Sequence, residues 1–457
     1  MEQRLLLLLM ISCLLTGCNK YLAKIADGSL STPKTLADVQ LLLDNDAQTN
    51  RVTPGLGAVA TDDIILDPAS SQDTSFSYYG IYTWQPNLYL DQGLTDNSWS
   101  RPYKAIYYAN VALHALDILP DNQKTDTLAC KAAKGTGIFY RSFHFFNLTE
   151  TFGQPYDSTT AAFAEGIPLR LDADAMKPVK RSSVGPVFDQ IVSDLKEAAS
   201  LLPSNVQRNF IFHPCRPAAW AMLARVLLVR QDYEQAMTYA DSCLKACSTL
   251  LNYDTIAANP AHPFDPSGNP ELLFQCSAYD YSPLYAAISS VDTVLYNSYA
   301  INDLRRTLYF QKRLSRPGFS FKGSYATARV FSGCSVDEVM LIRAECKARL
   351  KDVAGAMTDL NTLLVTRWKT GTFQPYTAAT PDEALHLVLT ERRKETPFRE
   401  LRWSDLRRLR QDPRTAVTLK RILGGRLLTL PPNSVLYAWL IPQGEIDLSG
   451  IEQNPQR

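Results

Sequence analysis

The stretch that decides the fold is PAAWAMLARVLLVRQDYEQAMTYADSCLKAC, residues 217–247. Its apolar residues recur at helical spacing on both sides of a short polar turn at Gln231 and Asp232, which predicts two antiparallel helices. Small residues at Ala224 and Ala236 would let these helices approach each other closely. Because a single hairpin of this kind cannot bury its own apolar face, the pattern predicts further copies.

A second copy lies at residues 338–368, EVMLIRAECKARLKDVAGAMTDLNTLLVTRW, which align with the first copy without a gap. Lys351-Asp352 takes the place of the polar turn, and Arg343 stands where the first copy has Leu223. Both copies resemble the tetratricopeptide pattern, in which a large residue, a leucine and small residues recur within about 34 positions. The alternative interpretation is chance similarity between two amphipathic hairpins.

Composition and charge limit the classes of function. The chain has 457 residues, of which 46% are hydrophobic, and its formal net charge is +1. These values are typical of a large globular protein. A nucleic-acid-binding protein normally carries a basic excess, so no nucleic-acid partner is expected.

The N-terminus has the pattern of a lipoprotein signal peptide. Arg4 supplies a positive charge, residues 5–15 form an apolar core, and the LTGC sequence at residues 15–18 ends in Cys18. The apolar run is too short to span a bilayer, which favours a secretory signal over a transmembrane helix. The ending resembles the bacterial lipobox, which implies removal of residues 1–17 and attachment of lipid, including palmitate, to Cys18. An ordinary secreted protein is the alternative.

Two irregular segments interrupt the helical pattern, near residues 48–98 and 248–335, and both are rich in aromatic residues. A long run without periodicity inside a compact protein usually has a function. Sugar rings present apolar faces that stack on aromatic side chains. The candidate ligand-binding residues are therefore the loop aromatics Tyr79, Tyr82, Trp84, Tyr279, Tyr281 and Tyr296. Packing or turn anchoring is the alternative role for each of them.

The sequence contains no recognised catalytic or metal-binding motif. A nucleophile elbow, a phosphate-binding glycine loop, a His-Glu-x-x-His helix and a Cys-x-x-Cys pair are all missing. Cys243 and Cys247 share a helix face, but two ligands alone do not make a zinc site, so buried apolar cysteines are expected. We predict no catalytic residue, no metal and no cofactor. Paired carboxylates such as Asp62-Asp63 leave an undetected glycosidase as an alternative.

The segment 391–410 mixes basic and acidic residues with apolar ones. Glu395 and Arg399 are spaced as an i,i+4 ion pair. We therefore predict a salt-bridged helix over residues 382–409 that packs on the core, and not a phosphate-binding patch. Beyond it an irregular tail to Arg457 is expected.

Ten short stretches, in their order along the chain, resemble motifs of the SusD/RagB family. They are YKAI at 103–106 with Asn110, residues 139–148, FGQP at 152–155, GIPL at 166–169, NDLR at 302–305, ERRKE at 391–395 with Phe398, RWSDLR at 402–407, IP at 441–442, EI at 445–446 and QNP at 453–455. The resemblance implies a mainly α, SusD-like fold with a large irregular, loop-rich half. It implies about four tetratricopeptide-like hairpins, near residues 99–151, 185–247, 336–368 and 382–410, in a single domain spanning 18–457.

The resemblance also implies a function. Such proteins are outer-membrane lipoproteins of Bacteroidetes-type bacteria, held by the lipid anchor alone, and they bind a nutrient and pass it uncleaved to a TonB-dependent transporter of SusC type. An oligosaccharide is the expected ligand. A peptide ligand remains open, as does a scaffold that grips a peptide or protein in the concave groove of its repeats. The expected position faces the cell exterior, although Asn19-Lys20 replaces the acidic residues that often follow the lipidated cysteine.

Overall fold

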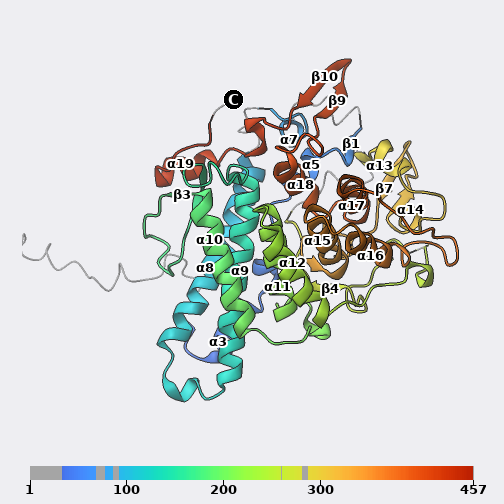
Figure 1. The fold of residues 1–457 in the computed structure, drawn as a ribbon. Coiled ribbons are helices and arrows are strands. Elements are labelled where there is room, and N and C mark those ends of the chain that lie inside the picture. Colours follow the sequence, from blue (N-terminus) through green and yellow to red (C-terminus); the bar gives the residue numbers. More distant parts are fainter. Residues whose placement is uncertain (1–32, 68–77, 86–91, 259, 280–286, 456–457) are drawn as a thin grey trace, which may run out of the picture.

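The computed structural model describes residues 33–67, 78–85, 92–258, 260–279 and 287–455, with the backbone alone for 92–96 (Figure 1). The described chain is mainly α-helical, and its strands form only two-stranded sheets. The predicted fold class, helical hairpins carrying a loop-rich part, is therefore confirmed.

Long helices packed side by side form a scaffold (Figure 1). They are α8 (Gln92–Ile118), α9 (Thr127–Phe152), α10 (Val184–Leu201), α11 (Arg216–Val229), α12 (Tyr233–Ala246), α15 (Val336–Arg349), α16 (Val353–Leu364), α17 (Pro381–Glu395) and α18 (Leu401–Leu409). Consecutive helices from α8 to α12 pack on one another, and α12 packs on α15 although the two are far apart in sequence. A short helix, α3 (Leu36–Leu43), covers α8 and α9.

The two aligned sequence copies make the same turn. Gln231 and Lys351 both have left-handed backbone conformations, with φ of 62° and 70°. Asp232 and Asp352 then cap the following helix, each accepting a hydrogen bond from the backbone N–H three residues later, at 3.2 and 2.9 Å. The equivalence of the two hairpins extends to single backbone angles, which chance similarity does not explain.

Small residues line the contact between the helices of each hairpin. Ala224 and Ala236 are fully buried in the first hairpin. Arg343, which departs from the apolar pattern in the second, forms ion pairs with Asp359 at 2.7 Å and Asp241 at 2.9 Å. It therefore links the second hairpin to α12 of the first.

The irregular segments contain short strands and helices that join distant parts of the chain. They are α5 (Leu56–Ala60), β1 (Ile64–Leu66), α7 (Tyr79–Tyr82), β4 (Leu272–Phe274), β5 (Ser289–Val291), α13 (Thr293–Asn297), α14 (Arg305–Leu308), β6 (Phe310–Lys312), β7 (Phe319–Phe321) and β8 (Cys334–Ser335). Strand β1 pairs antiparallel with β5, so the two irregular segments form one region beside the scaffold (Figure 1).

The single helix predicted over residues 382–409 is wrong. Helix α17 ends at Glu395, and α18 begins only at Leu401. Between them Phe398 and Glu400 have φ of 54° and 60°, which turns the chain sharply. Neither residue is a glycine, but Pro397 precedes them, and a proline inside a helical pattern usually ends the helix, so the sequence did contain a signal for this break.

The predicted ion pair between Glu395 and Arg399 is also wrong, because the turn separates their side chains. Glu395 binds Arg305 at 3.0 Å and Arg367 at 2.7 Å, whereas Arg399 binds Asp337 at 2.7 Å. All these partners are distant in sequence.

The C-terminal part is more ordered than the expected irregular tail. Strands β9 (Leu419–Leu423) and β10 (Arg426–Leu430) form a hairpin that projects at the top of Figure 1, and α19 (Gln443–Ser449) follows. Gly424 and Gly425 form the two-residue turn with φ of 54° and 77°. A Gly-Gly pair between two apolar runs is a recognised hairpin signal, so the sequence did contain the evidence for this element.

Candidate functional site

A hollow of about 270 Å³ lies between the short helix α7 and the β9–β10 hairpin, and we call it the aromatic hollow. Its lining residues are Tyr79, Thr83, Trp84, Gln85, Leu423, Arg426 and Leu428. Tyr79 is half-buried, and its hydroxyl has no hydrogen-bond partner among the described residues. The hollow thus combines aromatic and aliphatic walls with polar groups, as small-ligand sites do.

Arg421, a buried residue of strand β9, contacts both the rings of Tyr82 and Trp84 and the backbone next to the aromatic hollow. Its guanidinium lies 3.5 Å from the ring centroid of Tyr82 and 4.5 Å from that of Trp84. It also donates hydrogen bonds to the backbone carbonyls of Thr61 at 2.5 Å, Val59 at 3.2 Å and Tyr82. One side chain of the hairpin therefore fixes α7 against the segment that follows α5.

Tyr82 and Trp84 are packing residues in this structure, although they were candidates for stacking on a ligand. They are only 3% and 4% exposed. The Tyr82 hydroxyl accepts a hydrogen bond from the Leu66 N–H at 3.2 Å, and the Trp84 indole donates to the Ala60 carbonyl at 2.9 Å. Of the three candidates around α7, Tyr79 is the one with a partly exposed ring.

The remaining described candidates do not line the aromatic hollow. The ring of Tyr279 lies under the guanidinium of Arg101, 3.5 Å from its centroid. The ring of Tyr296 stacks on Phe319 with centroids 3.7 Å apart and has Arg306 at 4.9 Å on its ring. Tyr281 and the proposed lipid-bearing Cys18 lie outside the described residues.

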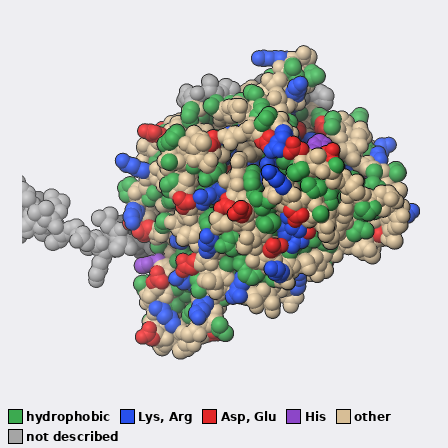
Figure 2. Space-filling model, in the orientation of Figure 1, with side chains coloured by type: hydrophobic (Ala, Val, Ile, Leu, Met, Phe, Trp, Pro, Cys, Tyr) green, Lys and Arg blue, Asp and Glu red, His purple; other side chains and the backbone are tan. Residues whose placement is uncertain are grey.

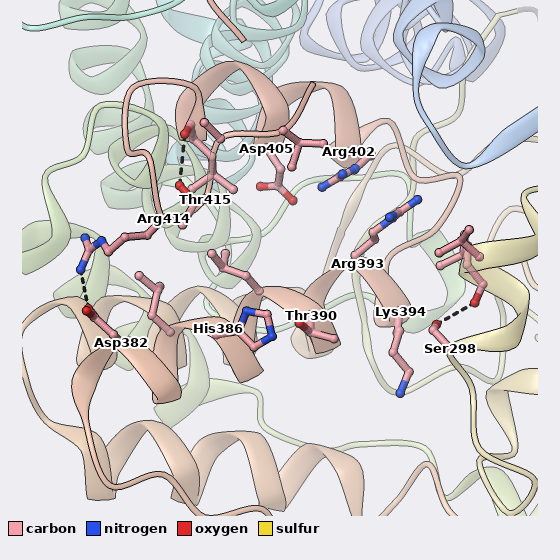
Figure 3. A pocket seen from close by; sticks show the side chains of 17 residues that line it. Ser298, Asp382, His386, Thr390, Arg393, Lys394, Arg402, Asp405, Arg414 and Thr415 are labelled. Carbon is pink, nitrogen blue, oxygen red and sulfur yellow. Dashed lines mark hydrogen bonds and ion pairs between the residues drawn. The ribbon is translucent and has the colours of Figure 1, made fainter. Parts of the chain in front are cut away.

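A larger hollow of about 400 Å³ lies between α13, α17, α18 and the segment after α18 (Figure 3). Its uncharged walls are mainly aliphatic and include no Phe, Tyr or Trp ring. Its charged residues are paired: Arg414 binds Asp382 at 2.5 Å, and Arg402 binds Asp62 at 2.8 Å. This hollow is lined by residues of both α17 and α18, so a single continuous helix over residues 382–409 does not predict it. It offers no ring on which a sugar can stack.

The motifs 302–305 and 391–395 meet in a fully buried ion network. Arg305 binds Asp303 at 2.7 Å, Glu391 at 2.6 Å and Glu395 at 3.0 Å. One guanidinium thus joins the second irregular segment to α17.

Arg367 extends this network into the second irregular segment. It binds Glu395 at 2.7 Å and Glu271 at 2.8 Å, and Tyr325 donates a hydrogen bond to Glu271 at 2.5 Å. Burial raises the pKa of Glu271 to about 7, against the lowering effect of Arg367. Since these side chains are buried from solvent, their role is to join the second irregular segment to the helical scaffold and not to contact a ligand.

The described part of the chain shows neither a metal-binding cluster nor a membrane-spanning helix. It holds no group of three or more His, Cys, Asp or Glu side chains placed to bind a metal ion. It also has no helix long and apolar enough to cross a membrane. Cys243 is buried and Cys247 half-buried, and both are free thiols.

The fold, helical hairpins with an irregular region on one side, is that of several solved structures. A SusD superfamily protein from Bacteroides thetaiotaomicron is 22% identical with a TM-score of 0.74, over 92% of this chain and 100% of its own. A sugar-binding protein from Bacteroides vulgatus, so described provisionally, is 20% identical with a TM-score of 0.71, over 93% and 99%. A laminarin-binding SusD-like protein is 17% identical with a TM-score of 0.67, over 93% and 100%.

Sequence comparison agrees with the fold. Residues 20–228 match the SusD-like family model described as starch-binding and associating with the outer membrane. SusD-like protein P2 of Formosa agariphila is 26% identical over 148 residues, which are 32% of this chain and 26% of that relative's length. The chain thus has the fold of SusD superfamily proteins, and its residues 20–228 match the SusD-like family model, in agreement with the resemblance of its motifs.

Proposed function

We propose that this protein captures a glycan at the outer membrane and delivers it to a TonB-dependent transporter of SusC type. The observation that carries the proposal is the aromatic hollow, where the half-buried ring of Tyr79 stands beside polar groups in a chain that matches the SusD-like family model. Tyrosine rings stack on the apolar faces of sugars, and neighbouring polar groups fix orientation. The laminarin-binding neighbour of the same fold supports a glycan ligand.

Binding without cleavage is part of the proposal. Glycosidases generally place two carboxylates on either side of the bond that breaks. The described lining of the aromatic hollow contains no carboxylate. We therefore expect the glycan to be released from the aromatic hollow without being cleaved.

The test is a binding survey of the soluble protein, made without its first 18 residues. Affinity electrophoresis in gels that contain single polysaccharides would identify a ligand, and the Tyr79→Ala variant would then be compared with wild type. Loss of one stacked ring should weaken binding roughly tenfold. Phe163→Ala, which removes an exposed ring in the loop before β2 (Glu165–Pro168), is the control and should bind as wild type does. Unchanged affinity in Tyr79→Ala would remove the aromatic hollow from the proposal.

Placement at the membrane is tested separately through Cys18. We expect the full-length protein to incorporate a palmitate analogue and to sediment with outer membranes, and Cys18→Ala to do neither, because attached acyl chains supply the membrane affinity. Co-purification of a barrel transporter with the lipidated protein would support the proposed partner. A Cys18→Ala protein that still incorporates label would refute the anchor.

A further inference from the structure

Apart from Tyr79, each described candidate aromatic residue has an arginine guanidinium against its ring. These arginines have no carboxylate partner among the described residues. The pairs are Tyr82 and Trp84 with Arg421, Tyr279 with Arg101, and Tyr296 with Arg306. Arg101 donates to an amide oxygen, at 3.1 Å, and Arg421 donates only to backbone carbonyls. None of the three forms an ion pair within the described residues.

Arg421 is the buried member of this group, and its charge is not neutralised locally. Burial lowers the pKa of its guanidinium to about 10, which reflects the cost of holding a cation among carbonyls and rings. The acids with an influence on it are engaged elsewhere. Asp62 binds Arg402 at 2.8 Å, and Asp292 accepts hydrogen bonds at the start of α13. A positive potential therefore lies under the aromatic hollow.

Arg426 adds an accessible cation at the hollow itself. It is the one charged residue in the described lining, it is exposed, and it forms no ion pair with any described residue. It stands across from Leu423 at the start of β10, on the hairpin side that faces Tyr79. Figure 2 shows Lys and Arg side chains on this projecting hairpin at the top of the molecule, and residues 419–430 contain no acidic residue.

The larger hollow of Figure 3 is the useful contrast. Its arginines already have carboxylate partners, as Arg402 does with Asp62 and Arg414 with Asp382. An anion arriving there would have to compete with these acids. At the aromatic hollow no protein carboxylate among the described residues stands in the way of Arg426.

We infer that the glycan bound in the aromatic hollow carries an anionic group, a carboxylate or a sulfate, and that Arg426 is the residue that selects it. This inference rests on the proposed function. The sugar ring lies on Tyr79, and the planar guanidinium receives the anionic oxygens as a bidentate hydrogen-bonding pair. The unneutralised Arg421 beneath adds attraction at longer range, because its surroundings screen charge less than water does.

The experiment uses two polysaccharide pairs that differ only in charge. One pair is polygalacturonate and its fully methyl-esterified form, and the other is carrageenan and its desulfated form. Affinity electrophoresis compares wild type with Arg426→Gln and with Lys420→Gln. The second variant is the matched control, since it removes an exposed cation from the outward face of the same hairpin.

We expect the charged member of at least one pair to bind wild type roughly ten- to a hundredfold more tightly than its neutral partner, because hydrogen bonds to charged groups are the stronger ones. Arg426→Gln should remove this preference and leave neutral binding unchanged, and Lys420→Gln should keep it. Added salt should weaken the preference. Which pair responds distinguishes carboxylate from sulfate.

Three results would overturn the inference. Equal binding of both members of each pair, still dependent on Tyr79, would refute anion selection and leave glycan binding standing. A preference that persists in Arg426→Gln, or falls equally in Lys420→Gln, would refute the assignment to Arg426. Absence of binding to these four polysaccharides and to the whole wider survey would refute the inference and the proposed function together.

Discussion

The repeat hairpins and the irregular region are held together in different ways. In the hairpins, neighbouring helices contact through fully buried small residues such as Ala236 and Ala356, and an aspartate caps each second helix. In the irregular region, Arg305 and Arg367 bind acidic residues from several segments with no exposure to solvent. The packing and capping contacts of the hairpins are local in sequence, whereas the ion network joins residues as far apart as 96 positions.

This difference has an energetic consequence. Local contacts each contribute little, and losing one leaves its neighbours satisfied. A buried ion network is different because removing one member leaves the others as unpaired charges away from water. The irregular region is therefore expected to tolerate substitution of its network far less well than the hairpins tolerate substitution of their caps.

The largest effect is expected for Arg305→Met. The change removes the guanidinium from Asp303, Glu391 and Glu395 and keeps a side chain of similar length. Breaking a buried pair from one side typically costs about 3–5 kcal/mol of unfolding free energy. Urea unfolding followed by circular dichroism would measure it.

Arg414→Met is the matched control for that measurement. Arg414 also binds two acids, Asp382 and Asp412, but its side chain is 53% exposed. Exposed pairs contribute about 0–1 kcal/mol, so little change is expected. Equal losses in the two variants would contradict the contrast between buried and exposed networks.

A smaller effect, visible only as a dependence on pH, is expected for Glu400→Gln. Burial raises the pKa of Glu400 from 4.5 to about 7, and its Oε1 has no hydrogen-bond partner among the described residues. The folded protein therefore holds this proton more tightly than the unfolded chain does. As pH rises from about 4.5 to about 7, only the unfolded chain readily ionises, so stability falls.

The glutamine variant cannot lose that proton. Wild type and Glu400→Gln should have similar stability at pH 5, and the variant should be more stable at pH 8 by up to about 3 kcal/mol. Melting curves at the two pH values measure this, with the exposed Glu197→Gln as control. A stability difference that is the same at both pH values would show that Glu400 is ionised throughout.

The hairpins could be read from the sequence because their evidence is local. Helical periodicity, small residues at the contact and an aspartate after the turn all lie within one stretch of residues 217–247. The network of Arg305 could not be read in this way. Residues 302–305 and 391–395 each resemble a family motif, but nothing within either stretch indicates that the two meet.

The site was predicted only in part for the same reason. The aromatic residues of α7 identify the neighbourhood of the hollow, yet Tyr82 and Trp84 face inward because Arg421 lies against them. Arg421 is 339 positions away from Tyr82 in sequence. Arg426 lies on the Gly-Gly hairpin, in a part of the chain for which the sequence analysis predicts an irregular tail, so it is not among the predicted candidates. Whether an aromatic ring is buried depends on the residues that pack against it, and Tyr82 and Trp84 are packed against Arg421, which is distant in sequence.

The smallest effect is expected for the helix caps, and it tests the equivalence of the two hairpins. Asp352→Ala removes the hydrogen bond to the Gly355 N–H, and Asp232→Ala removes its counterpart to the Gln235 N–H. Each should cost about 1 kcal/mol, since alanine leaves the first-turn N–H without its side-chain acceptor. Urea midpoints of both variants, compared with wild type, provide the measurement. If one cap cost several times more than the other, the two hairpins would differ in their packing despite the same turn, and equivalence in backbone angles would not extend to stability.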